Sequence, residues 1–224
     1  MVPPAHGGAR QPARMWERGE DPDFGRVAYF TDAVYAIALT LLVLDLRLPR
    51  MTGDSDSASS MLAALNDLIP KFVSFGVAFI LLARYWMANH SFFTRIGRVD
   101  RRYIGISMFY LAGVAFLPFP TSLVGEFEAN PISGVMFALT LAAVSGLETM
   151  LMWHAHSAGL WREPMSEEVH RWQIIGSLVP FAMFLATIPL AFVNTTVMLL
   201  SWLVIGPVLG HLVGSRRPEG AVED

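Results

Sequence analysis

The sequence predicts an all-α membrane protein with six transmembrane helices. Its 224 residues are 54% hydrophobic and only 16% charged, whereas a soluble domain has about 25% charged residues. The apolar residues are clustered into six stretches, and each comes close to the roughly 20 residues that cross about 30 Å of hydrocarbon. These stretches lie near 30–48, 69–92, 103–124, 131–155, 172–193 and 195–213.

The six stretches form one predicted membrane domain over residues 26–214. The first 25 residues are rich in Pro, Gly, Ala and Arg and lack the apolar core of a signal peptide. We therefore expect a disordered cytosolic tail over 1–25 and a second cytosolic tail over 215–224. The connections are short except for 49–67, whose Gly-Asp-Ser-Asp-Ser-Ala-Ser-Ser run is typical of a flexible surface linker.

Basic residues in short loops mark the cytosolic side of a membrane protein. Here they concentrate in the two tails, in the second loop near 95–102 and in the fourth loop near 162–171, while the third loop (125–130) has none. The first loop is the exception because it carries Arg47, Arg50 and Lys71. The balance predicts a multi-pass protein of the cell (plasma or inner) membrane with both termini in the cytosol.

Composition and motifs argue against several functions. The chain has no cysteine, so disulfides, thiolate metal sites and a cysteine nucleophile are absent. Its net charge of −3 and scattered arginines do not make a basic face for nucleic acid. His154 and His156 are two positions apart and do not share a helix face, so no metal site is predicted there. We find no catalytic motif and expect neither an enzyme nor a cofactor.

Ionisable residues flank the start of the first span, at Arg26 and Asp32. Such groups are costly at membrane depth and usually have partners. Because the second span ends on the side where the first begins, Trp86 and His90 lie at a similar depth, one helical turn apart. These polar groups can satisfy one another, which predicts a polar brace between the two spans. The alternative is that each side chain separately extends to the interface.

An apolar stripe follows on the first span. At about 100° per residue, Leu41, Leu44 and Leu48 fall within roughly 40° of Ile37, with Thr40 at the edge, while Asp32 lies about 140° away. Such a stripe is also compatible with ordinary helix packing, and a threonine often bonds its own helix. If copies of this helix surround an axis, the stripe forms a hydrophobic constriction, and the threonine hydroxyls offer oxygen ligands to an ion.

Asp45 lies near the outer end of the first span. A carboxylate there can concentrate cations at the mouth of a pore. An ordinary interfacial carboxylate is the alternative interpretation.

The motif Arg-x-x-x-Phe-Thr-Asp and the Ala-Val-Tyr-Ala-Ile run that follows it, within 26–49, resemble the first-helix signature of the transmembrane protein 175 family. This family comprises lysosomal potassium channels and their prokaryotic relatives. Its usual motif has serine where this chain has Thr31, which keeps the hydroxyl. Two further matches are the pair Trp86 and His90 and the Leu-Pro-Phe-Pro-Thr segment at 117–121. We expect this segment to end the third helix. The resemblance covers roughly residues 26–210.

The resemblance implies a single-repeat, homotetrameric channel whose pore is lined by the first helix of each subunit, without a selectivity-filter loop. Ile37 then matches the constriction, Leu41 and Leu44 the next hydrophobic layers, and Thr40 the residue tied to potassium preference. The bracing network is matched by Arg26, Phe30, Thr31, Asp32, Trp86 and His90.

The predicted function is a cation channel in the lipid bilayer that favours K⁺ modestly over Na⁺. Monovalent cations, K⁺ above all, are then the ions it handles, and no other metal is expected. Two alternatives stay open: a secondary transporter, which usually shows inverted repeats and broken helices, and a non-conducting scaffold subunit.

Overall fold

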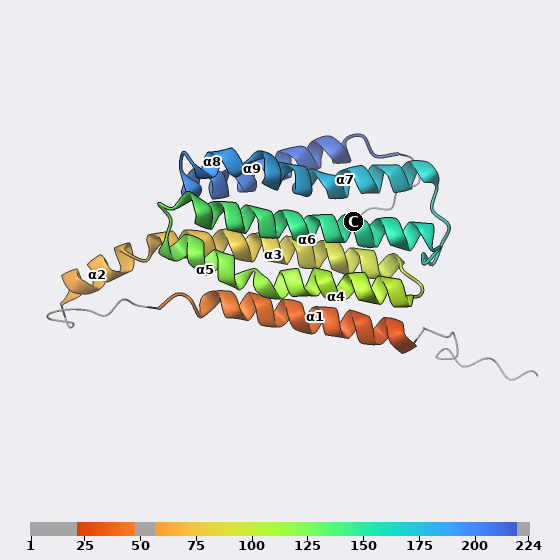
Figure 1. Cartoon of the computed structure of the whole chain (residues 1–224), viewed down its shortest axis with the longest axis horizontal. Coiled ribbons are helices and arrows are strands. Elements are labelled where there is room, and N and C mark those ends of the chain that lie inside the picture. The colour runs from red at the N-terminus through yellow and green to blue at the C-terminus, as the bar shows by residue number, and fades with distance from the viewer. Residues whose placement is uncertain (1–21, 48–56, 219–224) are drawn as a thin grey trace, which may run out of the picture.

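The structure is a computed structural model that describes residues 22–47 and 57–218, and in these ranges the chain is an all-helical bundle (Figure 1). Among the described residues, six helical segments are long and apolar enough to span a membrane, as the sequence predicted. The protein is therefore a multi-pass membrane protein. Its helices are α1 (Pro22–Val43), α2 (Ala58–Asn66), α3 (Ile69–Arg95), α4 (Arg101–Phe116), α5 (Pro118–Glu126), α6 (Pro131–Ser157), α7 (Glu167–Ala186), α8 (Ile188–Ala191) and α9 (Thr195–Gly214).

The first span differs from the predicted 30–48 at both ends. The helix begins at Pro22, where a proline is well suited to the first turn because its missing N–H would have no helical partner. It ends at Val43, and Leu44 and Asp45 form a turn in which the Leu46 N–H bonds the Val43 carbonyl. Helix α1 thus begins inside the stretch 1–25 that was expected as a tail. Residues 1–21 and 219–224, which make up most of the two predicted tails, lie outside the described residues.

The first loop contains a helix that the linker prediction missed. Helix α2 begins after Ser57, whose hydroxyl accepts the N–H of Ser60 at 3.2 Å. Serine is a favourable N-cap residue, and the Met, Leu and Ala residues that follow it have high helix propensity. The prediction of a flexible linker over 49–67 is therefore wrong for residues 58–66, and its first part, 49–56, lies outside the described residues.

Prolines interrupt two of the spans. The third span consists of α4 and α5, and Pro118 begins the second of these helices. A proline cannot donate the helical N–H bond and clashes with the preceding turn. The 117–121 motif therefore lies at a break within the third span, which continues to Glu126, and not at its close. The fifth span breaks in the same way between α7 and α8, which carries Pro189.

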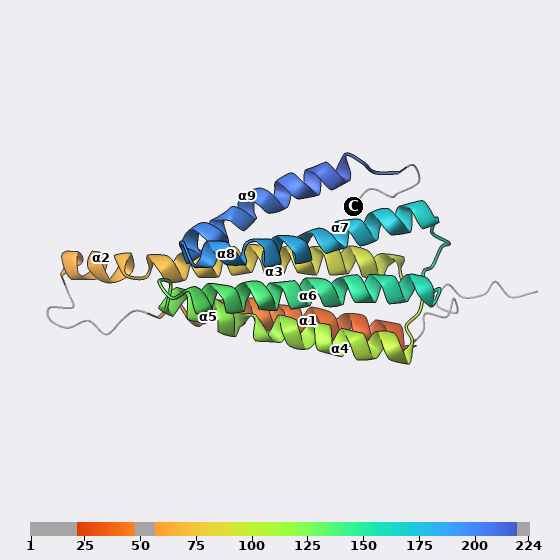
Figure 2. The ribbon, with the colours of Figure 1, turned by 45° about the horizontal axis from the view of Figure 1, so that its top comes forward.

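Helix α6 is the centre of the bundle and packs against α4, α5 and α7. Helix α1 lies at one edge, beside α4, with α7, α8 and α9 on the opposite side (Figures 1 and 2). Buried hydroxyl pairs join the layers: Tyr35 of α1 bonds Tyr110 of α4, and Tyr85 of α3 bonds Ser145 of α6. This arrangement leaves one side of α1 uncovered by its own subunit.

Candidate functional site along the first helix

Helix α1 has one buried face and one exposed face. The buried face turns toward α3 and α4 and is formed by Val27, Thr31, Tyr35, Ala38 and Leu42. The predicted stripe lies on the other side, where the side chains of Ile37, Leu41 and Leu44 are 58%, 42% and 58% exposed. Four consecutive turns of α1 therefore pack on the subunit, while its aliphatic stripe is free to face lipid or other copies of the chain.

Thr40 is exposed beside Ile37 and bonds its own helix. Its hydroxyl donates to the Ile37 carbonyl at 2.8 Å, as threonines in apolar helices commonly do. This bond uses the single proton of the hydroxyl and leaves the oxygen as an acceptor. The side chain therefore keeps a lone pair that can coordinate a cation passing the exposed face of α1.

Leu44 lies just beyond the helix, because its N–H bonds the Leu41 carbonyl at 3.1 Å in the turn that ends α1. The prediction that Leu44 continues a helical stripe is therefore wrong in conformation, although its side chain stays on the exposed surface. Leu48, the last member of the predicted stripe, lies outside the described residues. Neighbouring Asp45 is half-buried and accepts the Ser122 hydroxyl of α5 at 2.7 Å. This bond ties the end of α1 to α5 and holds the carboxylate there.

Three residues of the predicted brace meet at the contact between α1 and α3. The Trp86 indole N–H donates to an Asp32 carboxylate oxygen at 3.0 Å. The Trp86 and His90 rings stack with their centroids 5.5 Å apart. All three side chains are exposed, so the network lies on the surface of the subunit. Its role as a brace stays a prediction.

The other three members of the predicted brace do not join the contacts of Asp32, Trp86 and His90. Thr31 is buried in the contact with the rest of the bundle, whereas Phe30 is half exposed. Arg26 is exposed, and the described part of the chain supplies no hydrogen bond or ion pair to its guanidinium. Helix α1 therefore carries Arg26 and Asp32 on exposed surface and Thr31 on the packed side.

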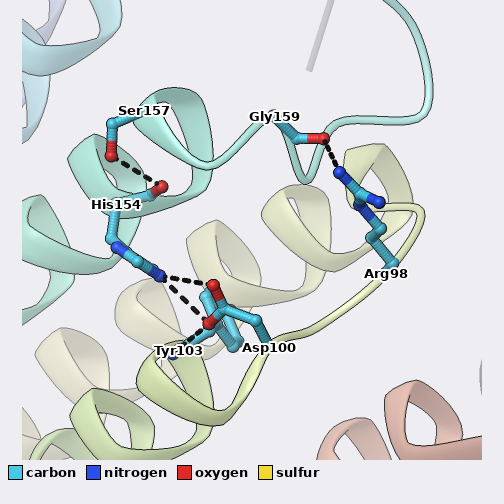
Figure 3. A network of polar contacts seen from close by, with 6 residues as sticks. All are labelled: Arg98, Asp100, Tyr103, His154, Ser157 and Gly159. Carbon is cyan, nitrogen blue, oxygen red and sulfur yellow. Dashed lines mark hydrogen bonds and ion pairs between the residues drawn. The ribbon is translucent and has the colours of Figure 1, made fainter.

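A second polar network lies at the arginine-rich end, the end of the bundle where α3 and α6 finish and α4 and α7 begin. Figure 3 shows Asp100 between the Tyr103 N–H, which it accepts at 2.6 Å, and the His154 Nε2 atom, which lies 3.0 Å from both of its carboxylate oxygens. Nearby, Arg98 donates to the Gly159 carbonyl at 3.4 Å. Partial burial raises the pKa of Asp100, but the hydrogen bonds from the Tyr103 N–H and from His154 outweigh this effect. The pKa of Asp100 is therefore below its ordinary value.

The two histidines of α6 were considered only as a pair with each other, and no metal site was predicted there. In the structure each has a carboxylate that is distant in sequence: His154 contacts Asp100, and His156 lies 3.3 Å from Glu167 while its ring stacks on His170. The described residues contain no group of three or more His, Asp or Glu arranged to hold a metal ion. These contacts join α4, α6 and α7 at the arginine-rich end.

Comparison with known proteins gives consistent matches. The family described as "Endosomal/lysosomal potassium channel TMEM175" matches residues 26–118. A potassium channel of Streptomyces collinus is 30% identical over 144 residues, which are 62% of this chain and 68% of that protein. A potassium channel of Chamaesiphon minutus is 29% identical over 147 residues, or 64% and 71% of the two chains.

The fold of this chain is similar to that of a solved channel structure. The crystal structure of a lysosomal potassium-selective channel TMEM175 homolog from Chamaesiphon minutus has a TM-score of 0.68 to this chain at 24% identity, covering 87% of this chain and 97% of the other. The matched region of the family includes α1 and α3, the two helices that carry the stripe and the Asp32–Trp86 contact.

Proposed function

Because this chain belongs to the TMEM175 family, we propose that it forms a potassium-permeable cation channel whose pore is lined by α1. The observation that carries this proposal is the exposed stripe of Ile37, Thr40 and Leu41 on a helix whose other side packs on the subunit through Tyr35, Ala38 and Leu42. An aliphatic face with one hydroxyl is suited to a narrow pathway when copies of it meet around an axis.

The assembly in this proposal is a homotetramer. Four copies of α1 surround the axis, Ile37 forms the narrowest ring, and Leu41 and Leu44 form the layers that follow it. In a dry ring of this kind the pore conducts only when water enters, which is gating by dewetting. The native mass of the detergent-solubilised protein tests the stoichiometry, and a stable monomer or dimer would contradict it.

Selectivity in this proposal depends on Thr40. Its hydroxyl oxygen coordinates the passing ion, while its proton stays bonded to the Ile37 carbonyl. A ring of threonine oxygens supplies few fixed dipoles compared with stacked carbonyl rings, so the preference for K⁺ over Na⁺ is modest. Asp45 raises the local cation concentration near the opposite end of α1 from Asp32, and both termini lie in the cytosol.

The decisive experiment measures ion flux through the purified chain in liposomes. We expect K⁺ flux that follows its own gradient without a coupled ion, with Na⁺ permeating less well. Flux that saturates and requires a second gradient would indicate a secondary transporter instead. Absence of flux from protein that is folded and inserted would indicate a non-conducting scaffold.

A further inference from the structure

A cavity of about 510 Å³ lies on the far side of the subunit from the α1 stripe. It is bounded by α3, α6 and α7. Trp172 and Val213 of α9 also line it, and the Trp172 indole N–H donates to the Val213 carbonyl at 2.9 Å. Figure 2 shows α9 diverging from α7 toward its C-terminal end. The volume falls within the range of small-molecule sites, and no residue of α1 lines the cavity.

Two acceptors in the cavity have no donor. Glu148 of α6 lies inside the fourth span, and the described residues give its carboxyl neither a hydrogen bond nor an ion pair. Gln173 of α7 is 9% exposed, and its Oε1 atom is buried without a donor among the described residues. An unpartnered buried acceptor costs about 1–3 kcal/mol, so the Gln173 oxygen favours a ligand that donates hydrogen bonds. The half-buried Glu148 carboxyl can accept from the same ligand.

The cavity is lined by one acidic and two basic side chains. Besides Glu148, its charged residues are Arg84 and Arg95. Arg95 has an interaction of its own, whereas Arg84 is exposed, and among the described residues no ion pair joins Arg84 to Glu148. The described residues therefore leave the Glu148 carboxyl without a cationic partner, and ionisable groups at membrane depth usually have one.

The remaining wall is apolar and aromatic. Phe92 and Trp161 pack edge to face, with centroids 5.2 Å apart, and both line the cavity. Aromatic faces attract organic cations and cover their apolar parts. The Trp161 Nε1 atom is buried and has no acceptor among the described residues, so it can donate to a hydroxyl on the ligand.

We propose that the cavity between α3, α6 and α7 binds a small organic ammonium ion. Its ammonium donates to Glu148 and Gln173, and its apolar body packs against Phe92 and Trp161. The site is separate from the α1 stripe and does not depend on the proposed channel function.

The test is calorimetric titration of the purified full chain in detergent with three probes of similar size. Tyramine carries an ammonium and a phenol, tyrosol replaces the ammonium with a hydroxyl, and 3-(4-hydroxyphenyl)propanoate replaces it with a carboxylate. We expect tyramine to bind at least tenfold more tightly than tyrosol, and the propanoate to bind no better than tyrosol. Equal affinities, tightest binding of the propanoate, or no binding of tyramine would each overturn the proposal.

Substitutions test whether Glu148 and Gln173 bind the ammonium. Glu148→Gln should weaken tyramine at least tenfold and leave tyrosol unchanged, and Gln173→Met should also weaken tyramine. Glu163→Gln is the matched control, because Glu163 is exposed in the loop next to Trp161, and it should bind like the wild type. Unchanged tyramine affinity in a folded Glu148→Gln variant would refute the assignment. If that variant does not fold, the ranking of the three probes on the wild-type protein decides alone.

Discussion

Replacing Ile37 with asparagine should increase K⁺ flux, because it makes the proposed constriction easier to wet. Ile37 is 58% exposed, and full exposure of such a side chain costs about 1.5–3 kcal/mol, so about 0.9–1.7 kcal/mol of this cost falls on the open face of each α1. If asparagine removes only one such contribution from the barrier, the rate rises about five- to eighteenfold. Four subunits contribute to the ring, which makes this a lower bound for the proposed pore.

The assay is K⁺ efflux from liposomes that contain equal amounts of folded wild-type and variant protein. Val43→Asn is the matched control, because Val43 is also apolar and half exposed on α1 but lies about 120° away from Ile37 around the helix. We expect wild-type flux from this control. Variants at Ile37 that conduct no better than the parent, or an equal increase from Val43→Asn, would refute the constriction at Ile37.

The other predictions concern selectivity, assembly and acid stability. Thr40→Val removes the oxygen ligand and should lower the K⁺/Na⁺ permeability ratio, and an unchanged bi-ionic reversal potential would count against a role for Thr40. Trp86→Phe deletes the indole N–H that bonds Asp32 and should cost about 1 kcal/mol because the bond is exposed. This loss lowers the melting temperature in detergent by about 2–4 °C, and an unaltered melting temperature would speak against the brace. Because hydrogen bonds lower the pKa of Asp100, its contribution to stability is present above the ordinary aspartate pKa of about 3.9 and is lost as the pH falls through the folded value. Asp100→Asn keeps the N-cap but removes this charge, so its thermal stability should fall less than that of the wild type between pH 6 and pH 3; parallel pH profiles would contradict the role of the His154–Asp100 contact.

The length of the apolar stretches was sufficient to predict the six spans, and helical periodicity was sufficient to predict which residues form the stripe on α1. Ile37 and Leu41 are exposed because Tyr35, Ala38 and Leu42 occupy the packed face, a division that follows from helical geometry. The depth argument placed Trp86 opposite Asp32, and the two side chains are hydrogen bonded in the structure. Arg26 was expected in the same network, but it is exposed and has no hydrogen bond or ion pair to the described residues.

Helix α2, the His154–Asp100 contact and the cavity at Glu148 were not predicted from the sequence. Helix α2 was missed because serines and aspartates around Ser57 favour turns as well as N-caps, and propensity alone did not separate the two. The contact of His154 with Asp100 joins residues far apart in sequence, so helical spacing carried no signal for it. Glu148 and Gln173 line one cavity although they come from α6 and α7, so helical spacing carried no signal for this site.

The hydroxyl pair between Tyr35 and Tyr110 limits how the first helix can move. Turning α1 by itself would separate two phenols that lie in the dry interior, at a cost of about 1–3 kcal/mol for each one stranded. Moving α1 together with α4 keeps the pair intact but disturbs the packing of α1 on α3 and of α4 on α6. The Asp45–Ser122 bond adds a second restraint, because it ties the other end of α1 to α5, beyond the helix break at Pro118.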